Sequence, residues 1–250
     1  MKKVILILLL CLCLFMTGCD GHTDETLPVT EPTLMPIDSG VFLETYSEES
    51  TGRTIDYHLY IPQNATEQMP LVIYLHGIGE IGSPALNENN PLITNAQDVY
   101  GDRYPFIILA PTCNYSSWIS KEMPARVKSL IDYIVDEYHI NQDKIIITGH
   151  SMGSSGVFRL IQNYGDYFSA AVPVSDPDVT LVDAESCTAV AIWAFAGSLE
   201  NPFNHDIERL IGKIEGYGGY ARYTEFENVK HGQTAHYAFS RDTFEWALSR

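Results

Sequence analysis

The residues best suited to chemistry in this sequence are 149–153, which read GHSMG. An apolar run at 144–148 precedes them and an amphipathic segment follows as far as Tyr164, a pattern that predicts a strand, a sharp turn and a helix. The glycines on either side of Ser151 leave room where a Cβ would strike the neighbouring strand or helix. The hydroxyl of Ser151 would thereby be held out from the sheet, which suits a nucleophile.

The elements that must position this turn follow from the hydrophobic pattern. Alternating segments at 41–47 and 54–61 predict an antiparallel pair at a sheet edge. Continuous apolar runs predict buried strands at 71–75, 106–110, 145–148, 170–174, 189–196 and 220–226. Helical spacing predicts helices at 124–138, from the turn to 164, at 205–215 and at 239–248, and the long connection after 75 predicts a short helix or a functional loop. Strands alternating with helices after an antiparallel start predict a mostly parallel, three-layer α/β sheet.

This segment order, the turn HGIGE at 76–80 and the GHSMG turn together resemble an α/β-hydrolase-fold serine esterase, from about residue 41 to the C-terminus. Within that superfamily the chain is similar to small esterases with an H-G-x-G-E-x-G turn, here residues 76–82, which are related to polyhydroxybutyrate depolymerases and feruloyl esterases. The resemblance implies an α/β-hydrolase catalytic domain at 41–250 with an antiparallel N-terminal edge.

A serine nucleophile needs a base within hydrogen-bonding reach, and in the resembled fold the order along the chain is Ser, acid, His. That order leaves His205, His231 and His236 as candidates. His231 follows the last predicted strand by a short loop, where the family places its base, and is the expected one. We expect His205 to cap a helix or face solvent and His236 to lie on the surface or the rim of the site.

The acid is expected on the loop after the strand at 189–196, which makes Glu200 the candidate. Relatives usually carry Asp at this position, and Glu reaches one methylene further. This departure leaves Asp206 open as a rival. Asp176 stays open as well, because it follows the preceding strand and some hydrolases take their acid from there.

Attack on an ester places negative charge on the carbonyl oxygen, which two backbone N–H groups would stabilise. The expected donors are Met152, directly after the nucleophile at a helix N-terminus, and Ile78 in the upstream turn. His76 is either part of this site or a residue that pins the turn by hydrogen bonding to backbone. His150 is expected to pack rather than to react.

The substrate cleft is expected to be open. About fourteen residues separate the strand ending near 174 from the one starting near 189, too few for a cap domain. Bulky or polymeric esters would reach such a cleft. Tyr115 and Trp118 are candidates for an aromatic wall that binds substrate, or they pack the loop that carries them.

The N-terminal residues predict export. Residues 1–18 begin with two lysines, continue as an apolar run and end in small residues before Cys19, which resembles a lipoprotein signal peptide with Cys19 as the lipidated residue. Residues 19–40 have the composition of a flexible tether. We therefore expect an extracytoplasmic, membrane-anchored lipoprotein, secreted if Cys19 is not lipidated.

The charge and the cysteine content of the sequence narrow the range of binding partners and cofactors that we expect. The formal net charge of −17 disfavours nucleic acid. Only Cys113 and Cys187 remain in the predicted domain; the spacing of the cysteines indicates no metal site, and a disulfide between the two stays open. No cofactor is implied.

The function predicted is hydrolysis of carboxylic esters through an acyl-enzyme intermediate, on small or polysaccharide-linked esters of acetyl or feruloyl type. Two alternatives stay open: a serine peptidase of prolyl-oligopeptidase type, which shares the turn and the triad order, and a noncatalytic binding protein on a hydrolase scaffold.

Overall fold

The computed structural model describes residues 34–80, 89–114 and 117–250 of the chain. The chain divides into two units, residues 1–33 and 34–250, and only the second contains described residues. The predicted signal peptide, Cys19 and most of the predicted tether therefore lie outside the described part. Among the described residues, no helix is long and apolar enough to cross a membrane.

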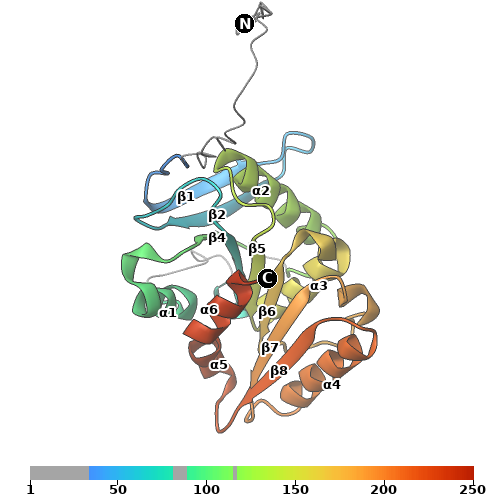
Figure 1. The fold of residues 1–250 in the computed structure, drawn as a ribbon. Coiled ribbons are helices and arrows are strands. Elements are labelled where there is room, and N and C mark those ends of the chain that lie inside the picture. The colour runs from blue at the N-terminus through green and yellow to red at the C-terminus, as the bar shows by residue number, and fades with distance from the viewer. Residues whose placement is uncertain (1–33, 81–88, 115–116) are drawn as a thin grey trace, which may run out of the picture. The chain divides into compact units, whose positions relative to one another are not determined.

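The described strands form one sheet in the order β1-β2-β4-β3-β5-β6-β7-β8 (Figure 1). β1 pairs with β2 and β2 with β4 in antiparallel fashion, and the remaining pairs are parallel. The strands are β1 Gly40–Ser47, β2 Thr54–Ile61, β3 Leu71–Leu75, β4 Ile107–Pro111, β5 Ile145–His150, β6 Ala170–Val174, β7 Ala191–Gly197 and β8 Ala221–Phe226. The α-helices are α1 Pro91–Tyr100, α2 Met123–Glu137, α3 Met152–Tyr164, α4 Phe203–Gly216, α5 His231–Ala238 and α6 Arg241–Leu248. Short 3-10 turns are η1 Ile78–Glu80, η2 Gly101–Arg103, η3 Gly165–Tyr167 and η4 Glu185–Cys187.

Both faces of the sheet are covered by helices. Successive side chains of a strand point to opposite faces, so Leu71, Ile73 and Leu75 of β3 enter one core and Val72 and Tyr74 enter the other. The first core is closed by α2, α3 and α4, and the second by α1, α5 and α6. This double cover explains why the central strands read as continuous apolar runs rather than as an alternating pattern.

The architecture confirms the predicted fold class: a mostly parallel sheet, an antiparallel N-terminal edge, helices on both faces and only the turn η4 between β6 and β7, in place of a cap. The long connection after β3 carries α1. The helix expected at 239–248 is present as α6, which spans Arg241–Leu248. A further helix, α5, begins at His231 in a segment for which no element is predicted. Its sequence, HGQTAHYA, has no clear apolar stripe, so the pattern alone could not reveal it.

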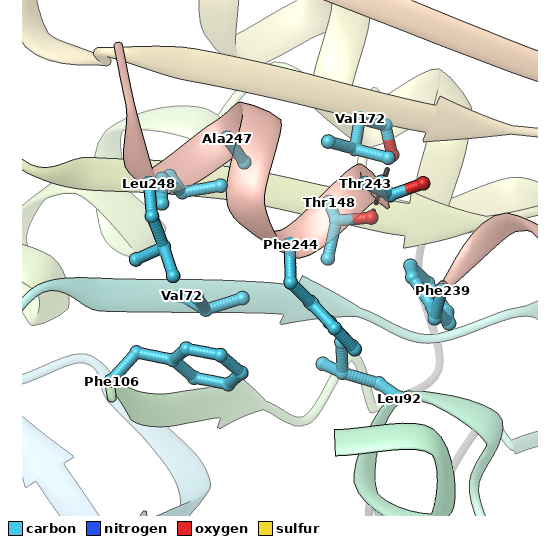
Figure 2. Close-up of a pocket in the computed structure, with 11 residues that line it drawn as sticks. Val72, Leu92, Phe106, Thr148, Val172, Phe239, Thr243, Phe244, Ala247 and Leu248 are labelled. Carbon is cyan, nitrogen blue, oxygen red and sulfur yellow. Dashed lines mark hydrogen bonds between the residues drawn. The ribbon is translucent and has the colours of Figure 1, made fainter. Parts of the chain in front are cut away.

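Beneath α6 lies a small apolar cavity of about 20 Å³, shown in Figure 2. Phe244 and Leu248 of α6 reach down toward Val72 of β3 and toward Phe106, which directly precedes β4. Its lining includes the Thr148 hydroxyl, which already donates to the Val172 carbonyl at 2.6 Å. A space of this size holds about one water and offers it no free polar partner, so the cavity is a packing feature of the core.

Candidate active site

The turn between β5 and α3 holds Ser151 in a strained backbone conformation. Ser151 has φ 57° and ψ −123°, in the left-handed half of the map that favours glycine. Close approach of another strand explains one of its flanking glycines: a Cβ on Gly153 would lie 1.8 Å from the carbonyl oxygen of Leu75 in β3. The sequence folds into this turn because only glycine lets β3 and α3 come so close.

A chain of hydrogen bonds runs from Ser151 to Glu200. The Nε2 atom of His231 lies 2.9 Å from the Ser151 Oγ, and its Nδ1 lies 2.8 Å from the Glu200 Oε2. Because a carboxylate only accepts, the Nδ1–H of His231 donates to Glu200, which leaves Nε2 to accept the Ser151 hydroxyl proton. The order nucleophile, base, acid that a serine hydrolase needs is therefore met in geometry.

Glu200 is buried but remains the ionised member of this chain. Burial by itself would raise the pKa of its carboxyl group, yet hydrogen bonds from His231, Thr234, Gly197 and Ser175 outweigh burial and lower that pKa. The side chain has no exposed surface, whereas the His231 side chain is 41% exposed. Glu200 is thus held in the core while His231 faces the solvent side.

The rival acids and bases lie elsewhere. Asp206 forms an ion pair with Arg209 on the surface of α4. Asp176 is buried and accepts hydrogen bonds from the Ser155 hydroxyl and the Asp178 N–H. His205 and His236 are both exposed. Of the candidates named from the sequence, the structure brings together Ser151, His231 and Glu200.

Two N–H groups at the predicted positions are available for an oxyanion. Within the described part of the chain, no hydrogen bond uses the N–H of Met152, the first residue of α3, or that of Ile78. The N–H of Gly77 is occupied, because it donates to the Glu80 Oε2 at 3.0 Å. Glu80 thereby fixes the turn that carries Ile78.

Comparison with known proteins supports the fold assignment. No family model matches the chain. A bifunctional acetylxylan esterase/xylanase of Neocallimastix patriciarum, XynS20E, is 27% identical over 174 residues, which are 68% of this chain and 24% of that protein. A thermostable esterase of known structure is 28% identical, with a TM-score of 0.73, over 84% of this chain and 62% of the other. This chain has the α/β-hydrolase fold.

A solved structure of similar fold is the feruloyl esterase module of Clostridium thermocellum, complexed with sinapinate. It is 16% identical, with a TM-score of 0.67, over 84% of this chain and 89% of that one. The chain spans about a quarter of the curated relative and less than two thirds of the thermostable esterase. What these proteins share with it is the scaffold, on which the α/β-hydrolase elbow places Ser151 at the end of β5.

His76 of the α/β-hydrolase turn has a structural role. Its Nδ1–H donates to the Gly77 carbonyl at 2.8 Å and its Nε2 accepts the Cys113 N–H at 2.9 Å. Burial lowers the pKa of the imidazole, which favours this neutral form. The ring therefore ties the turn after β3 to the segment after β4.

Trp118 packs the loop rather than lining a cleft. The side chain is 2% exposed, and its indole N–H donates to the His76 carbonyl at 2.9 Å. A Cβ on Gly156 of α3 would lie 2.6 Å from the Trp118 Cβ. Trp118 therefore does not form an aromatic wall of a cleft, because its ring faces the core. Tyr115 lies outside the described residues.

Three contacts of the site could not be read from the sequence. The Nε2–H of His150 donates to the His231 carbonyl at 2.9 Å, so the residue before the nucleophile holds the start of α5. Ser175 and Thr234 both donate to Glu200. Thr234 follows His231 by three residues, and two residues at that spacing lie on the same face of a helix. This spacing could have indicated the contact, but the sequence pattern does not predict helix α5.

The described residues form no metal site, and the Cys187 thiol is protonated. Among residues 34–80, 89–114 and 117–250, no cluster of His, Cys, Asp or Glu has the arrangement of a metal site. Cys113 and Cys187 are buried and do not form a disulfide with each other. Burial raises the pKa of the Cys187 thiol to about 12, which keeps it protonated and unreactive.

Proposed function

We propose that this chain is a serine carboxylesterase that works through an acyl-enzyme intermediate. The observation that carries the proposal is the continuous hydrogen-bond chain from the Ser151 hydroxyl through His231 to the buried Glu200. The esterases among its relatives support the reaction class.

In the proposed mechanism the Ser151 Oγ attacks the ester carbonyl carbon and its proton passes to the His231 Nε2. The negative charge of the tetrahedral intermediate lies on the carbonyl oxygen, where the N–H groups of Met152 and Ile78 would stabilise it. Collapse of the intermediate breaks the bond to the alcohol oxygen, which takes the proton from His231. Water then attacks the acyl-Ser151 bond, with His231 again accepting and returning a proton, and the carboxylic acid leaves. Glu200 stabilises the charged imidazole in both halves.

The substrates we propose are acetyl or feruloyl-type esters, small or linked to polysaccharide. The names of the relatives support this class: an acetylxylan esterase and a feruloyl esterase. Ile78, in the turn of the proposed oxyanion donors, and Leu199, next to Glu200 in the chain, are 69% and 54% exposed, and these apolar residues are the ones we propose to contact an acyl group. A panel of acetylated xylan, methyl hydroxycinnamates and p-nitrophenyl esters of rising chain length tests this choice.

A burst assay tests the reaction. The wild-type protein should release p-nitrophenol from p-nitrophenyl acetate with an initial burst equal to the enzyme concentration, and Ser151→Ala should abolish it. A fluorophosphonate probe should label the wild type at Ser151, and the absence of an adduct would favour a noncatalytic scaffold. An unchanged rate in Ser151→Ala would refute the proposal.

A matched pair of variants tests which carboxylate is the acid of the proposed triad. Glu200→Gln should lower kcat by about a thousandfold or more, since the His231 imidazolium loses its charged partner. Asp206→Asn alters the rival carboxylate on α4 and should leave kcat within about twofold of the wild type. The opposite ranking would move the acid to Asp206.

We also propose that residues 1–18 are removed as a signal peptide and that Cys19 carries the lipid anchor of an extracytoplasmic protein. The order of basic, apolar and small residues before Cys19 supports this. Labelling with a radioactive fatty acid should mark the wild type and not Cys19→Ala. Equal labelling of the two would exclude Cys19 as the site.

A further inference from the structure

Two neighbouring parallel strands end in a serine with a left-handed backbone. Ser151 follows β5 with φ 57°, and Ser175 follows β6 with φ 54°. Non-glycine residues in this conformation are strained, and such strain persists where the surrounding structure needs the side chain. Ser151 has an evident use for its hydroxyl. Ser175 is fully buried, outside the reach of any substrate, and calls for a different explanation.

The hydroxyl of Ser175 is directed at the acid. It donates to the Glu200 Oε1 at 2.8 Å, while the Ser175 N–H donates to the Phe195 carbonyl in β7 at 2.8 Å. The hydrogen bond from the Ser175 N–H fixes this residue against β7. In the same left-handed conformation, the Ser175 hydroxyl donates to the Glu200 carboxylate. A glycine would adopt this backbone without strain but would supply no donor.

The helix that carries the base supplies a second donor. Thr234 lies one turn after His231 in α5, and residues three apart share a helix face. Its hydroxyl donates to the Glu200 Oε1 at 2.5 Å while the His231 Nδ1–H donates to Oε2. Thr234 is fully buried. One turn of α5 thus holds both oxygens of the same carboxylate.

The third donor comes from the turn of Glu200 itself. The N–H of Gly197 donates to the Glu200 Oε1 at 2.6 Å, so the side chain folds back onto its own turn. A Cβ on Gly197 would lie 2.2 Å from the Val229 carbonyl oxygen, which keeps this position free of a side chain. Oε1 therefore accepts three hydrogen bonds, and Oε2 is left for His231.

We infer that Ser175 and Thr234 are positioning residues of the esterase reaction, which hold Glu200 so that its Oε2 receives the His231 Nδ1–H. The inference rests on the proposed function. With Oε1 held by Ser175, Thr234 and Gly197, the carboxylate cannot rotate about its terminal bond without breaking three hydrogen bonds. The fixed Oε2 keeps His231 in the tautomer that accepts from Ser151.

The test compares variants of each hydroxyl with a variant that restores it. Thr234→Val keeps the shape and removes the donor, and should lower kcat for p-nitrophenyl acetate by on the order of tenfold, with KM nearly unchanged. Thr234→Ser returns the hydroxyl and should recover most of kcat. Wild-type kcat in a folded Thr234→Val protein, or no recovery in Thr234→Ser, would overturn the inference.

Variants of Ser175 separate the effect of the hydroxyl on catalysis from its effect on stability. Ser175→Ala and Ser175→Gly both remove the hydroxyl and should lose kcat to a similar extent, although Ser175→Gly also relieves the backbone strain and should unfold at a higher urea concentration than Ser175→Ala. Gln68 is the control, since it has φ 63° in the loop before β3. Gln68→Gly should leave kcat unchanged. A Ser175→Gly protein with wild-type kcat would show that the hydroxyl does not position the acid.

A spectroscopic readout keeps this inference separate from the proposed function. The His231 Nδ1–H in a hydrogen bond to Glu200 should give a downfield proton resonance in the wild type, and Thr234→Val should shift or broaden it. If the wild type fails to hydrolyse any ester, the proposed function falls, and the resonance still tests the arrangement. An identical resonance in the wild type and Thr234→Val would contradict the positioning role.

Discussion

Asp176 is the residue whose replacement should change the pH dependence of stability most. Its carboxyl group lies beneath the first turns of α3, with 1% of the residue exposed and Oδ2 without a hydrogen-bond partner among the described residues. Burial raises its pKa to about 7, against the opposing hydrogen bonds from the Asp178 N–H and the Ser155 hydroxyl. The carboxyl is therefore protonated in the folded protein at pH values where it is ionised in the unfolded chain.

The sign of the effect follows from proton counting. Between the unfolded pKa of 3.8 and the folded value of about 7, the folded state holds a proton that the unfolded state has lost. Stability therefore falls as pH rises through this window, and the full penalty is present above pH 7. A shift of about three units corresponds to about 4 kcal/mol, of which roughly 3 kcal/mol lies between about pH 5 and about pH 8.

Urea unfolding of the wild type and Asp176→Asn at about pH 5 and about pH 8 measures this difference. The asparagine does not titrate, so the stability of Asp176→Asn relative to the wild type should rise by roughly 3 kcal/mol between the two conditions. Asp178→Asn is the control, because Asp178 is exposed and the pKa of its carboxyl is lowered by hydrogen bonds from Thr180. A pH-independent difference between Asp176→Asn and the wild type would refute the reasoning.

Three further substitutions have defined outcomes. Gly153→Ala should destabilise the protein by about 3 kcal/mol or more in urea unfolding, since the added Cβ would overlap the Leu75 carbonyl. Gly212→Ala, in the interior of α4 where a Cβ meets no neighbouring atom, should stabilise the protein by about 1 kcal/mol. His150→Phe removes the donor to the His231 carbonyl and should lower kcat several-fold with KM unchanged in steady-state kinetics, while an unchanged kcat would exclude a positioning role. Phe244→Ala would enlarge the cavity beneath α6 and should cost about 3 to 5 kcal/mol, and a loss below about 1 kcal/mol would mean that the cavity collapses.

The local pattern of the sequence was sufficient for most of the scaffold. The short apolar run of β-branched residues before Ser151 favoured a buried strand, and the glycines around Ser151 indicated close backbone approach, so the strand-turn-helix unit was predictable from neighbours in sequence. Boundaries differ from prediction by one or two residues at β4, β7 and α4, because helix and strand ends depend on hydrogen bonds that composition does not encode.

What the sequence by itself determined was the order of elements and the residue types available for chemistry, with Ser151 at the tip of a tight turn. Only the tertiary structure decided which carboxylate faces His231, because the sequence left Glu200, Asp206 and Asp176 all open and these residues differ in what folds around them. The donors that fix Glu200 come from β6, from its own turn and from α5, segments far apart along the chain. Contacts of this kind are created by the packing of the strand ends, and no local pattern records them.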